Sequence, residues 1–296
     1  MAAVIQIEGL VKRYGRVEAV RGVSFAVEEG EAFGYLGPNG SGKTTTIRSF
    51  LGLVSPSEGQ VSVLGRRIPD HLTEVLSDIG YLPGELGLWP SMTGADVLDH
   101  LARLQSRGAP DRDALCERFE LSPAELDRQV RFYSRGMKQK LGIVQAFQHR
   151  PALAVLDEPT EGLDPVMKDR FVSLLKEHTA AGATLFLCSH ILSEVELATD
   201  RVCVLKEGRV VKTGPTRDLT GERLRHCTLE LDEPLPDGLL DLPGVEALRV
   251  EGLRVHFDYR GDMRPLLERL PRAKVREFLS EPERLTEAFF DVYGER

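Results

Sequence analysis

The chain has 296 residues, of which 42% are hydrophobic and 28% charged, a composition typical of a folded protein with one large and one small domain. A net charge of −8 without a long basic run argues against unspecific binding to nucleic acid or anionic lipid. No stretch reaches the roughly 18 apolar residues that a bilayer crossing needs, and the N-terminus lacks the pattern of a signal peptide. We therefore expect contact with a membrane only through a protein partner.

The four cysteines, Cys116, Cys188, Cys203 and Cys227, are widely spread and form no CxxC pair. This spacing predicts neither a disulfide framework nor a structural zinc site. A reducing cytoplasm is the expected compartment.

Short β-branched runs alternate with amphipathic segments along the first two thirds of the chain. The predicted strands are 4–10, 22–30, 31–37, 60–65, 152–158 and 183–189. The predicted helices are 43–53, 94–104, 114–119, 136–148, 166–179 and 192–198. Strands interleaved with helices predict an α/β fold with a largely parallel central sheet covered on both faces.

Two segments depart from this alternation. Residues from about 85 to 148 have helical signals and almost no strand signal, which predicts a helical insertion. From about residue 221, strands at 227–232, 245–250 and 253–259 alternate with helical segments at 262–270 and 282–294. We therefore predict a domain of residues 1–220 and a small C-terminal α+β domain of residues 221–296, which is just large enough to bury its own core.

A glycine-rich loop follows the predicted strand 31–37. Residues 37–44 read GPNGSGKT and fit GxxxxGK[ST] between a strand and a helix, the context that a phosphate-binding loop requires. Backbone N–H groups around Gly40 and Gly42 can point at phosphate oxygens, Lys43 can bridge the β and γ phosphates, and Thr44 can bind Mg²⁺. The alternative is a glycine-rich turn with a solvated lysine. The expected nucleotide-binding residues are Gly37, Asn39, Gly40, Ser41, Gly42, Lys43, Thr44 and Thr45.

Two carboxylates follow the buried run 153–156. Asp157 and Glu158 stand where a strand meets a loop, and ligands of doubly wound sheets lie beyond such strand ends. Asp157 is the expected partner of Mg²⁺, and Glu158 is the expected base that orients and activates a water against the γ-phosphate. An acidic surface turn is the alternative.

A second strand end carries His190. A lone histidine is usually structural or solvated, but this one follows a buried strand downstream of two phosphate elements. We predict that it contacts the γ-phosphate. Asp164, in the sequence GLDP, is expected to cap the helix that begins at Pro165.

The order of these motifs resembles that of the ATP-binding cassette (ABC) ATPases over about residues 3–220. The phosphate loop is followed by the helical insertion, YSRGMKQKL, LAVLDEPTEGLDP and LCSH. Ser134 and Gly136 keep two positions of the family signature LSGGQ, whereas Arg135 and Met137 replace a glycine and a glutamine. The resemblance implies a P-loop NTPase core with an antiparallel β subdomain and a helical insertion, which hydrolyses ATP with Mg²⁺.

The same resemblance implies a homodimer. In a head-to-tail pair, Ser134 and Gly136 of one copy would complete the nucleotide site of the other, and Asp164 would lie at the dimer interface. Tyr14 would stack on the adenine, although an edge-strand surface tyrosine is equally compatible with its neighbours. Ser134 can cap the helix that follows and leave backbone N–H groups to meet an anion, whereas the SRG sequence taken alone would more often be an ordinary helix cap.

The signature and the C-terminal block look like those of the ATPase subunits of ABC-2 type exporters. This implies a peripheral subunit on the inner face of the cell membrane, paired with separate ABC-2 permease subunits. For the C-terminal domain we expect a packing or dimer-stabilising role. A soluble ABC ATPase acting on ribosomes or DNA is the main alternative, and the single cassette, the lack of heptads and the acidic charge disfavour it. An importer ATPase is a third interpretation, and the signature and the C-terminal block disfavour it.

The segment IGYLPGELGLWPS at 79–91 begins as a strand-like run and departs from the family at Gly84. The resemblance places there a glutamine that reaches Mg²⁺ and the attacking water and links the nucleotide to the transport subunits. Gly84 cannot do this, and a carboxylate at Glu85 would add repulsion unless Mg²⁺ lay close. A water could fill the space. The expected groove for a helix of the membrane partner involves Leu86, Leu88, Trp89 and Met92, although core packing is equally expected for Leu86 and Leu88.

Overall fold

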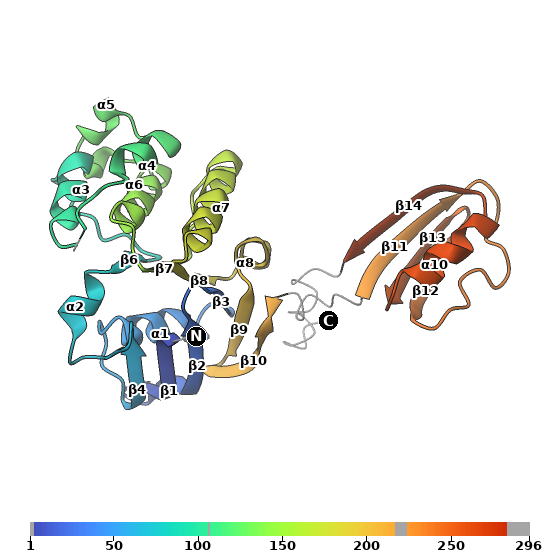
Figure 1. Cartoon of the computed structure of the whole chain (residues 1–296), viewed down its shortest axis with the longest axis horizontal. Helices are drawn as coiled ribbons and strands as arrows, with labels where there is room; N and C mark the ends of the chain where they lie inside the picture. Colours follow the sequence, from blue (N-terminus) through green and yellow to red (C-terminus); the bar gives the residue numbers. More distant parts are fainter. Residues whose placement is uncertain (1–2, 106, 217–223, 283–296) are drawn as a thin grey trace. The chain divides into compact units, whose positions relative to one another are not determined.

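The computed structural model describes residues 3–105, 107–216 and 224–282 (Figure 1). The chain divides into two compact units, Met1–Gly214 and Pro215–Arg296. Each unit has its own sheets and its own hydrophobic core, so the two are described separately.

A six-stranded sheet forms the centre of the first unit, in the order β10-β9-β3-β8-β7-β6. Pairing is parallel from β9 to β6. The strands are β3 (Ala32–Leu36), β6 (Ile79–Leu82), β7 (Leu153–Asp157), β8 (Thr184–Ser189), β9 (Arg201–Lys206) and β10 (Arg209–Pro215). Every residue of β3, β7 and β8 is buried, as expected for parallel strands covered on both faces. The predicted α/β fold is confirmed.

A second sheet is antiparallel and has the order β2-β1-β4-β5. Its strands are β1 (Ala3–Tyr14), β2 (Val17–Glu28), β4 (Glu58–Val63) and β5 (Arg66–Arg67). The helix α1 (Lys43–Phe50) contacts β1, β2, β4 and β7 and therefore lies between the two sheets. The antiparallel β subdomain implied by the family resemblance is thus present.

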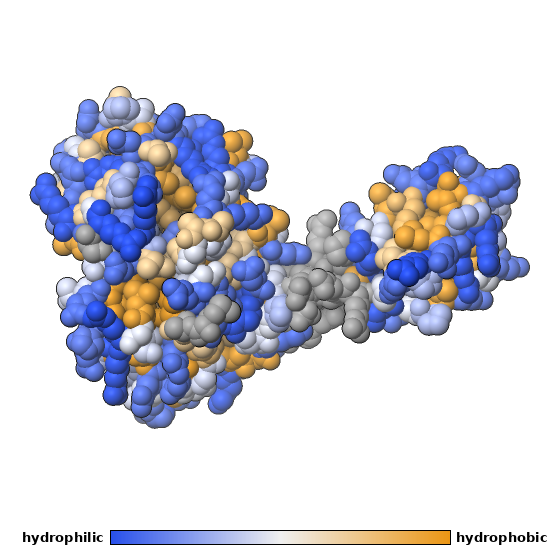
Figure 2. Space-filling model, in the orientation of Figure 1, coloured by the Kyte–Doolittle hydropathy of each residue, from blue (hydrophilic) through white to orange (hydrophobic). Residues whose placement is uncertain are grey.

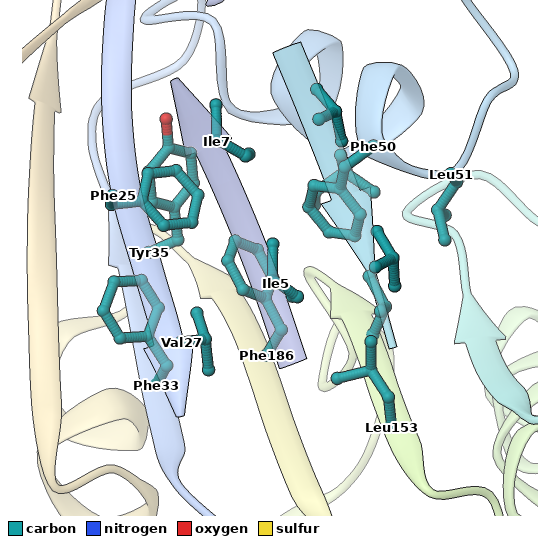
Figure 3. Packing of buried hydrophobic residues seen from close by; sticks show 14 of the residues in the cluster. Ile5, Ile7, Phe25, Val27, Phe33, Tyr35, Phe50, Leu51, Leu153 and Phe186 are labelled. Carbon is teal, nitrogen blue, oxygen red and sulfur yellow. The ribbon is translucent and has the colours of Figure 1, made fainter. Parts of the chain in front are cut away.

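The core between the sheets is rich in aromatic rings (Figure 3). Phe186 of β8 lies 5.4–6.0 Å, centroid to centroid, from Phe25, Phe33 and Tyr35 and meets Phe50 edge-on at 5.1 Å. Gly34 faces the opposite side of β3, where a Cβ would lie 2.5 Å from a methyl group of Val195 in α8 (Leu192–Ala198). The helices α8 and α7 (Pro165–Ala180) therefore cover the second face of the central sheet.

The predicted helical insertion lies between β6 and β7. It contains α3 (Gly94–Ala102), α4 (Arg112–Arg118), α5 (Pro123–Leu126), the 3₁₀ turn η1 (Val130–Phe132) and α6 (Arg135–Phe147). Thr93 and Ser122 form capping boxes at the starts of α3 and α5, so the sequence sets both boundaries locally. The short helix α2 (Leu72–Leu76) precedes β6 and was not predicted.

The second unit contains a four-stranded antiparallel sheet with the order β12-β13-β11-β14. The strands are β11 (Leu224–Leu231), β12 (Val245–Glu251), β13 (Arg254–Arg260) and β14 (Val275–Pro282). Alternate residues of β11 and β13 are buried with Leu266 and Leu270, from α10 (Arg264–Arg269) and the 3₁₀ turn η2 (Leu270–Arg272).

The predicted hairpin of the second unit is confirmed as β12 and β13, whereas β14 was not predicted. The helical prediction for 282–294 lies outside the described residues, except for Pro282. Figure 2 shows hydrophobic surface on this unit, and the exposed fractions of Leu248, Val250 and Leu253 are 45–52%.

Candidate nucleotide site

The loop from Gly37 to Gly42 connects the buried strand β3 to α1. Gly40 and Gly42 have positive φ angles of 81° and 104°, which L residues with side chains rarely adopt. A Cβ on Gly37 would lie 2.5 Å from the Leu205 carbonyl oxygen, and one on Gly42 equally close to that of Ala19. The Ser41 carbonyl also accepts a hydrogen bond of 2.9 Å from Gly208 N. At Gly37 and Gly42 there is therefore room for the backbone only, whereas nothing lies within 4 Å of a Cβ on Gly40.

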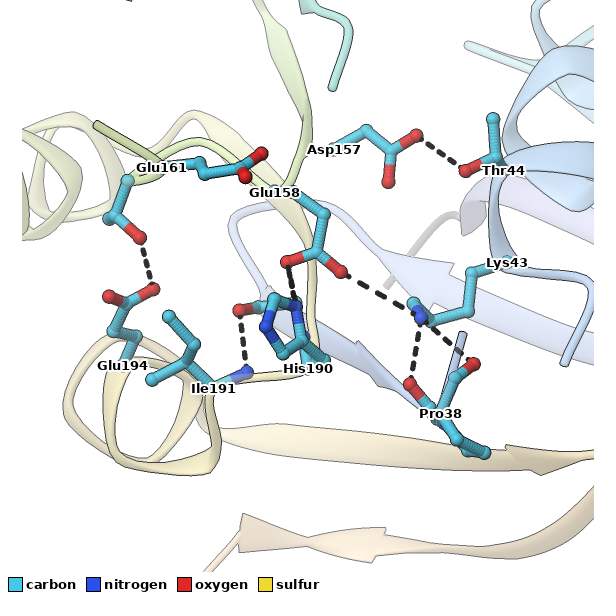
Figure 4. Close-up of polar contacts among 12 residues, drawn as sticks. Pro38, Lys43, Thr44, Asp157, Glu158, Glu161, His190, Ile191 and Glu194 are labelled. Atoms are coloured by element: carbon cyan, nitrogen blue, oxygen red, sulfur yellow. Dashed lines mark hydrogen bonds and ion pairs between the residues drawn. The ribbon is translucent and has the colours of Figure 1, made fainter. Parts of the chain in front are cut away.

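The Lys43 side chain folds back over this loop. It is 6% exposed, and its Nζ donates to the carbonyls of Gly37 and Pro38 at 2.7 and 3.2 Å. Its Nζ also lies 3.7 Å from Glu158 Oε1. The ammonium group is thus held at the mouth of the loop, between the loop carbonyls and the acidic strand end (Figure 4).

The end of β7 brings Asp157 to the start of α1. Thr44 Oγ1 donates to Asp157 Oδ2 at 2.8 Å, while the buried Oδ1 has no hydrogen-bond partner among the described residues. The unpaired carboxylate oxygen of Asp157 and the hydroxyl of Thr44 are two hard oxygen donors, the kind of ligand that Mg²⁺ prefers. Within residues 3–105, 107–216 and 224–282 no cluster of three His, Cys, Asp or Glu could hold a metal. Phosphate and water would have to supply the remaining ligands.

Glu158 lies between Lys43 and His190. Its Oε2 is 2.7 Å from His190 Nδ1 and accepts from the His190 backbone N–H at 3.2 Å. Its own N–H donates to the Cys188 carbonyl, so the residue is anchored to β8 although its φ is +51°. The two strand ends predicted from the sequence therefore meet, since β7 and β8 are parallel neighbours.

The negative strand end acts on two neighbouring groups. Burial, and then the charge of Asp157, raises the pKa of the Cys188 thiol well above its ordinary value. Burial and Asp157 likewise raise the pKa of Tyr81 to about 12. Both groups stay protonated at neutral pH, so neither competes with Glu158 as a base.

The signature residues lie at the N-terminus of α6. Ser134 caps the helix, with its Oγ accepting from Met137 N at 3.2 Å, as predicted. Arg135 forms an ion pair with Glu161, and a Cβ on Gly136 would lie 3.0 Å from the Gly162 carbonyl. These contacts tie the signature to the loop that follows Glu158. Asp164 caps α7, with Oδ1 accepting from Met167 N at 3.0 Å.

Tyr14 and Gly84 lie at the edges of this region. Tyr14 ends β1 with 48% of its surface exposed, and Lys12 Nζ lies 5.1 Å from the centre of its ring. A Cβ on Gly84 would lie 3.4 Å from the carbonyl oxygen of Asp157 and 3.8 Å from its Oδ2. A longer side chain at position 84 would therefore meet the carboxylate beside Thr44.

The segment after Gly84 is only partly buried. Leu86, Leu88 and Met92 are half-buried, and Leu86 packs on Gly142 of α6. Trp89 is 42% exposed, and its ring meets that of His100 edge-on at 5.1 Å.

Sequence reasoning missed a buried pair beside the site, Thr160 and Glu194. Thr160 stands two residues after Glu158, and Glu194, in the first turn of α8, stands four residues after His190. No local signal marked the pair, because His190 precedes α8 and the contact joins segments 34 residues apart.

A parallel sheet that joins a phosphate loop to an acidic strand end defines the P-loop nucleoside triphosphatases. The model of the ABC transporter family matches residues 20–161. The chain is 33% identical to the Nod factor export ATP-binding protein I of Burkholderia orbicola, over 99% of this chain and 97% of that protein. It is 35% identical to the bacitracin transport ATP-binding protein BcrA of Bacillus licheniformis, over 79% of this chain and 76% of that protein.

Solved structures agree. The ATP-binding subunit of an ABC transporter matches with a TM-score of 0.69 and 30% identity, over 74% of this chain and 92% of that one. A dimeric bacterial ABC transporter cassette matches with a TM-score of 0.67 and 25% identity, over 72% and 99%. The chain belongs to the ATP-binding proteins of ABC transporters, and it is an ATPase. No helix in the described part of the chain has the length and apolar character needed to cross a bilayer.

Proposed function

We propose that this chain is the ATP-hydrolysing subunit of an ABC-2 type exporter, which works as a head-to-tail dimer on the inner face of the cell membrane. The observation that carries the catalytic part is the convergence of Lys43, Thr44, Asp157, Glu158 and His190 at one edge of the central sheet. The full-length match to a protein named for Nod factor export supports the exporter part.

Each side chain of this cluster has a distinct role in the proposal. Lys43 binds the β and γ phosphates of ATP, and Thr44 and Asp157 hold Mg²⁺, which neutralises charge on the phosphates. Glu158 is the base that takes a proton from the attacking water. His190 fixes the orientation of Glu158 through its Nδ1 and contacts the γ-phosphate.

The remaining binding groups surround the cluster. The backbone around Asn39, Gly40, Ser41, Gly42 and Thr45 cradles the phosphates, and Tyr14 stacks on the adenine, for which its exposure leaves a face available. Ser134 and Gly136 of one copy complete the site of the other. Similarity to a dimeric cassette supports this arrangement.

The proposed link to the membrane permease runs through Trp89. Its exposed indole stands on the same segment of the chain as the half-buried Leu86, Leu88 and Met92, and this segment starts next to Asp157 at Gly84. Aromatic side chains of this kind often carry much of the binding energy of an interface. Movement near the metal can therefore reach a helix of the partner.

Glu158→Gln tests the catalytic assignment. The amide keeps the size of the side chain but cannot accept the water proton, so hydrolysis should fall at least about 100-fold while ATP binding persists. ATPase assays and retention of radiolabelled ATP measure the two effects. Hydrolysis at the parent rate would show that Glu158 is not the base.

Trp89→Ala tests the coupling. Transport by the complex reconstituted with its permease should fall several-fold, while the ATPase rate of the free subunit stays within about twofold. His100→Ala is a matched control, because it removes the edge-on partner but leaves the indole. Equal loss of transport and of basal ATPase in Trp89→Ala would contradict the coupling role. Purification of the chain with a multi-span membrane protein separates the exporter from a soluble ATPase.

A further inference from the structure

A buried carboxylate joins the loop after Glu158 to the helix after His190. Glu194 in α8 is 9% exposed, and its Oε2 accepts from Thr160 Oγ1 at 2.5 Å (Figure 4). Its other oxygen, Oε1, lies 3.0 Å from Lys168 Nζ in α7. Thr160 is itself only 3% exposed. One side chain therefore connects the loop, α7 and α8.

The contacts of Glu194 tolerate little movement of the elements that they join. Burial of a carboxylate is costly unless its oxygens are paired, and here each oxygen has a partner on a different element. A shift of either element would leave a buried polar group unsatisfied, at a cost larger than the worth of the bond itself. The three elements therefore move together or lose the network.

The two ends of the network lie next to the proposed catalytic pair. Thr160 is two residues beyond Glu158, and Glu194 is four residues beyond His190, in the first turn of α8. Glu158 has a left-handed backbone, which a residue other than glycine keeps only when its surroundings impose it. Gln139 of α6 adds a second tether, because its Nε2 donates to the Pro159 carbonyl at 2.5 Å.

We propose that Glu194 is a positioning residue for ATP hydrolysis. Through Thr160 it holds the loop of Glu158 at a fixed distance from the turn of His190, so that the contact of 2.7 Å between the two side chains is maintained. Neither Glu194 nor Thr160 touches ATP in this proposal. The inference rests on the roles proposed above for Glu158 and His190.

Thr160→Val is the first test, because it removes the hydroxyl and keeps the shape. The kcat of the full chain should fall about 10- to 100-fold, the range expected for a small misplacement of catalytic groups. The KM for ATP should change less than about threefold, since Lys43, Thr44 and Asp157 lie outside the network. Thr160→Ser keeps the hydroxyl and should restore kcat to within about threefold of the parent.

Glu194→Gln gives an independent measurement of the same network. Loss of the charge breaks the ion pair with Lys168 and should lower kcat with little change in KM. If the two residues act as one unit, the double variant with Thr160→Val will be no slower than the slower single variant. Fully multiplicative losses in the double variant would overturn the proposal.

Thr184→Val is the matched control. Thr184 is 1% exposed and accepts from Gly30 N at 3.0 Å, at the other end of β8 from His190. Its replacement should lower the temperature of unfolding without a loss of kcat. A parent kcat in Thr160→Val, or equal losses in Thr160→Val and Thr184→Val, would overturn the positioning role. If Glu158→Gln hydrolysed ATP normally, the proposed base would fail instead, whatever the result at Thr160.

Discussion

The two ends of β7 and β8 handle buried polar groups in opposite ways. At the carboxyl ends, Asp157, Glu158 and His190 face Lys43 and Thr44 in a network of hydrogen bonds and one ion pair. At the amino ends, a cavity of about 490 Å³ is lined by apolar side chains such as Phe147 and Leu174, by His178, and at its rim by charged residues such as Asp111 and Arg150. The strands are buried along their whole length, so burial alone does not determine the protonation and pairing of polar groups at their ends. The partners supplied by the flanking loops determine both.

The histidines near the amino end show this contrast most clearly. Burial lowers the pKa of His149 to about 4 and that of His178 to about 4. His178 meets the ring of Phe147 edge-on at 5.2 Å, whereas His190 at the other end is exposed beside a carboxylate. The amino end therefore keeps its two histidines neutral, whereas the carboxyl end pairs its histidine with a carboxylate.

The largest expected effect lies at the carboxyl end. Glu158→Gln should reduce hydrolysis at least about 100-fold yet leave the temperature of unfolding within a few degrees, because the remaining amide oxygen can still accept from the His190 backbone N–H and only the ion pair of 3.7 Å with Lys43 is lost. Differential scanning calorimetry beside the ATPase assay checks this. A large loss of stability would mean that the carboxyl end also serves as a structural anchor, and the comparison would fail.

A moderate effect is expected at the amino end, as a dependence of stability on pH. An unfolded histidine titrates near 6.5, so between pH 6.5 and 4 the unfolded chain binds more protons than the folded one. The contribution of the two neutral histidines to the free energy of unfolding is therefore complete above about pH 6.5. It is lost as the pH drops towards 4, by about 1–2 kcal/mol for each histidine after solvent screening. Urea unfolding at several pH values measures it.

The variants His149→Gln and His178→Gln sharpen this test. Glutamine cannot take up the proton, so each should flatten the slope of stability between pH 4 and 6.5 relative to the parent chain. An unchanged slope in the double variant would show that other groups cause the acid sensitivity.

The smallest effect is expected at Gly84. A Cβ there lies at ordinary contact distance from Asp157, so Gly84→Gln should fold normally. We expect the ATPase rate of the free subunit to change less than about threefold, because Lys43, Thr44, Asp157 and Glu158 already provide the binding groups. Gly84→Ala is the matched control for the backbone. A tenfold gain with glutamine alone would show that the missing amide limits catalysis.

Local sequence signals predicted most of the larger unit. The strand and helix periods along residues 4–198, the phosphate loop and the two strand ends all depend on neighbouring residues, and the structure contains them. The meeting of Glu158 and His190 followed from the rule that parallel strands end at the same edge.

The missed features depend on contacts between distant segments. The pair of Thr160 and Glu194 is separated by 34 residues and is visible only when α8 packs beside the loop. Strand β14 carries no clear alternation of apolar residues, and its pairing with β11 supplies its conformation. The short distance between Gly84 and Asp157 likewise could not be predicted, because it depends on the register of β6 with β7.

The bond from Gly208 N to the Ser41 carbonyl, together with the approach of Leu205 to Gly37, has a consequence for synthesis on the ribosome. The floor of the phosphate loop comes from residues made long after the loop itself. Binding of ATP is therefore expected to stabilise the larger unit only after β9 and the turn that follows it are in place. Chains that stop before β9 hold the complete GPNGSGKT sequence and yet lack the β9 pairing of β3 and both of these contacts to the loop.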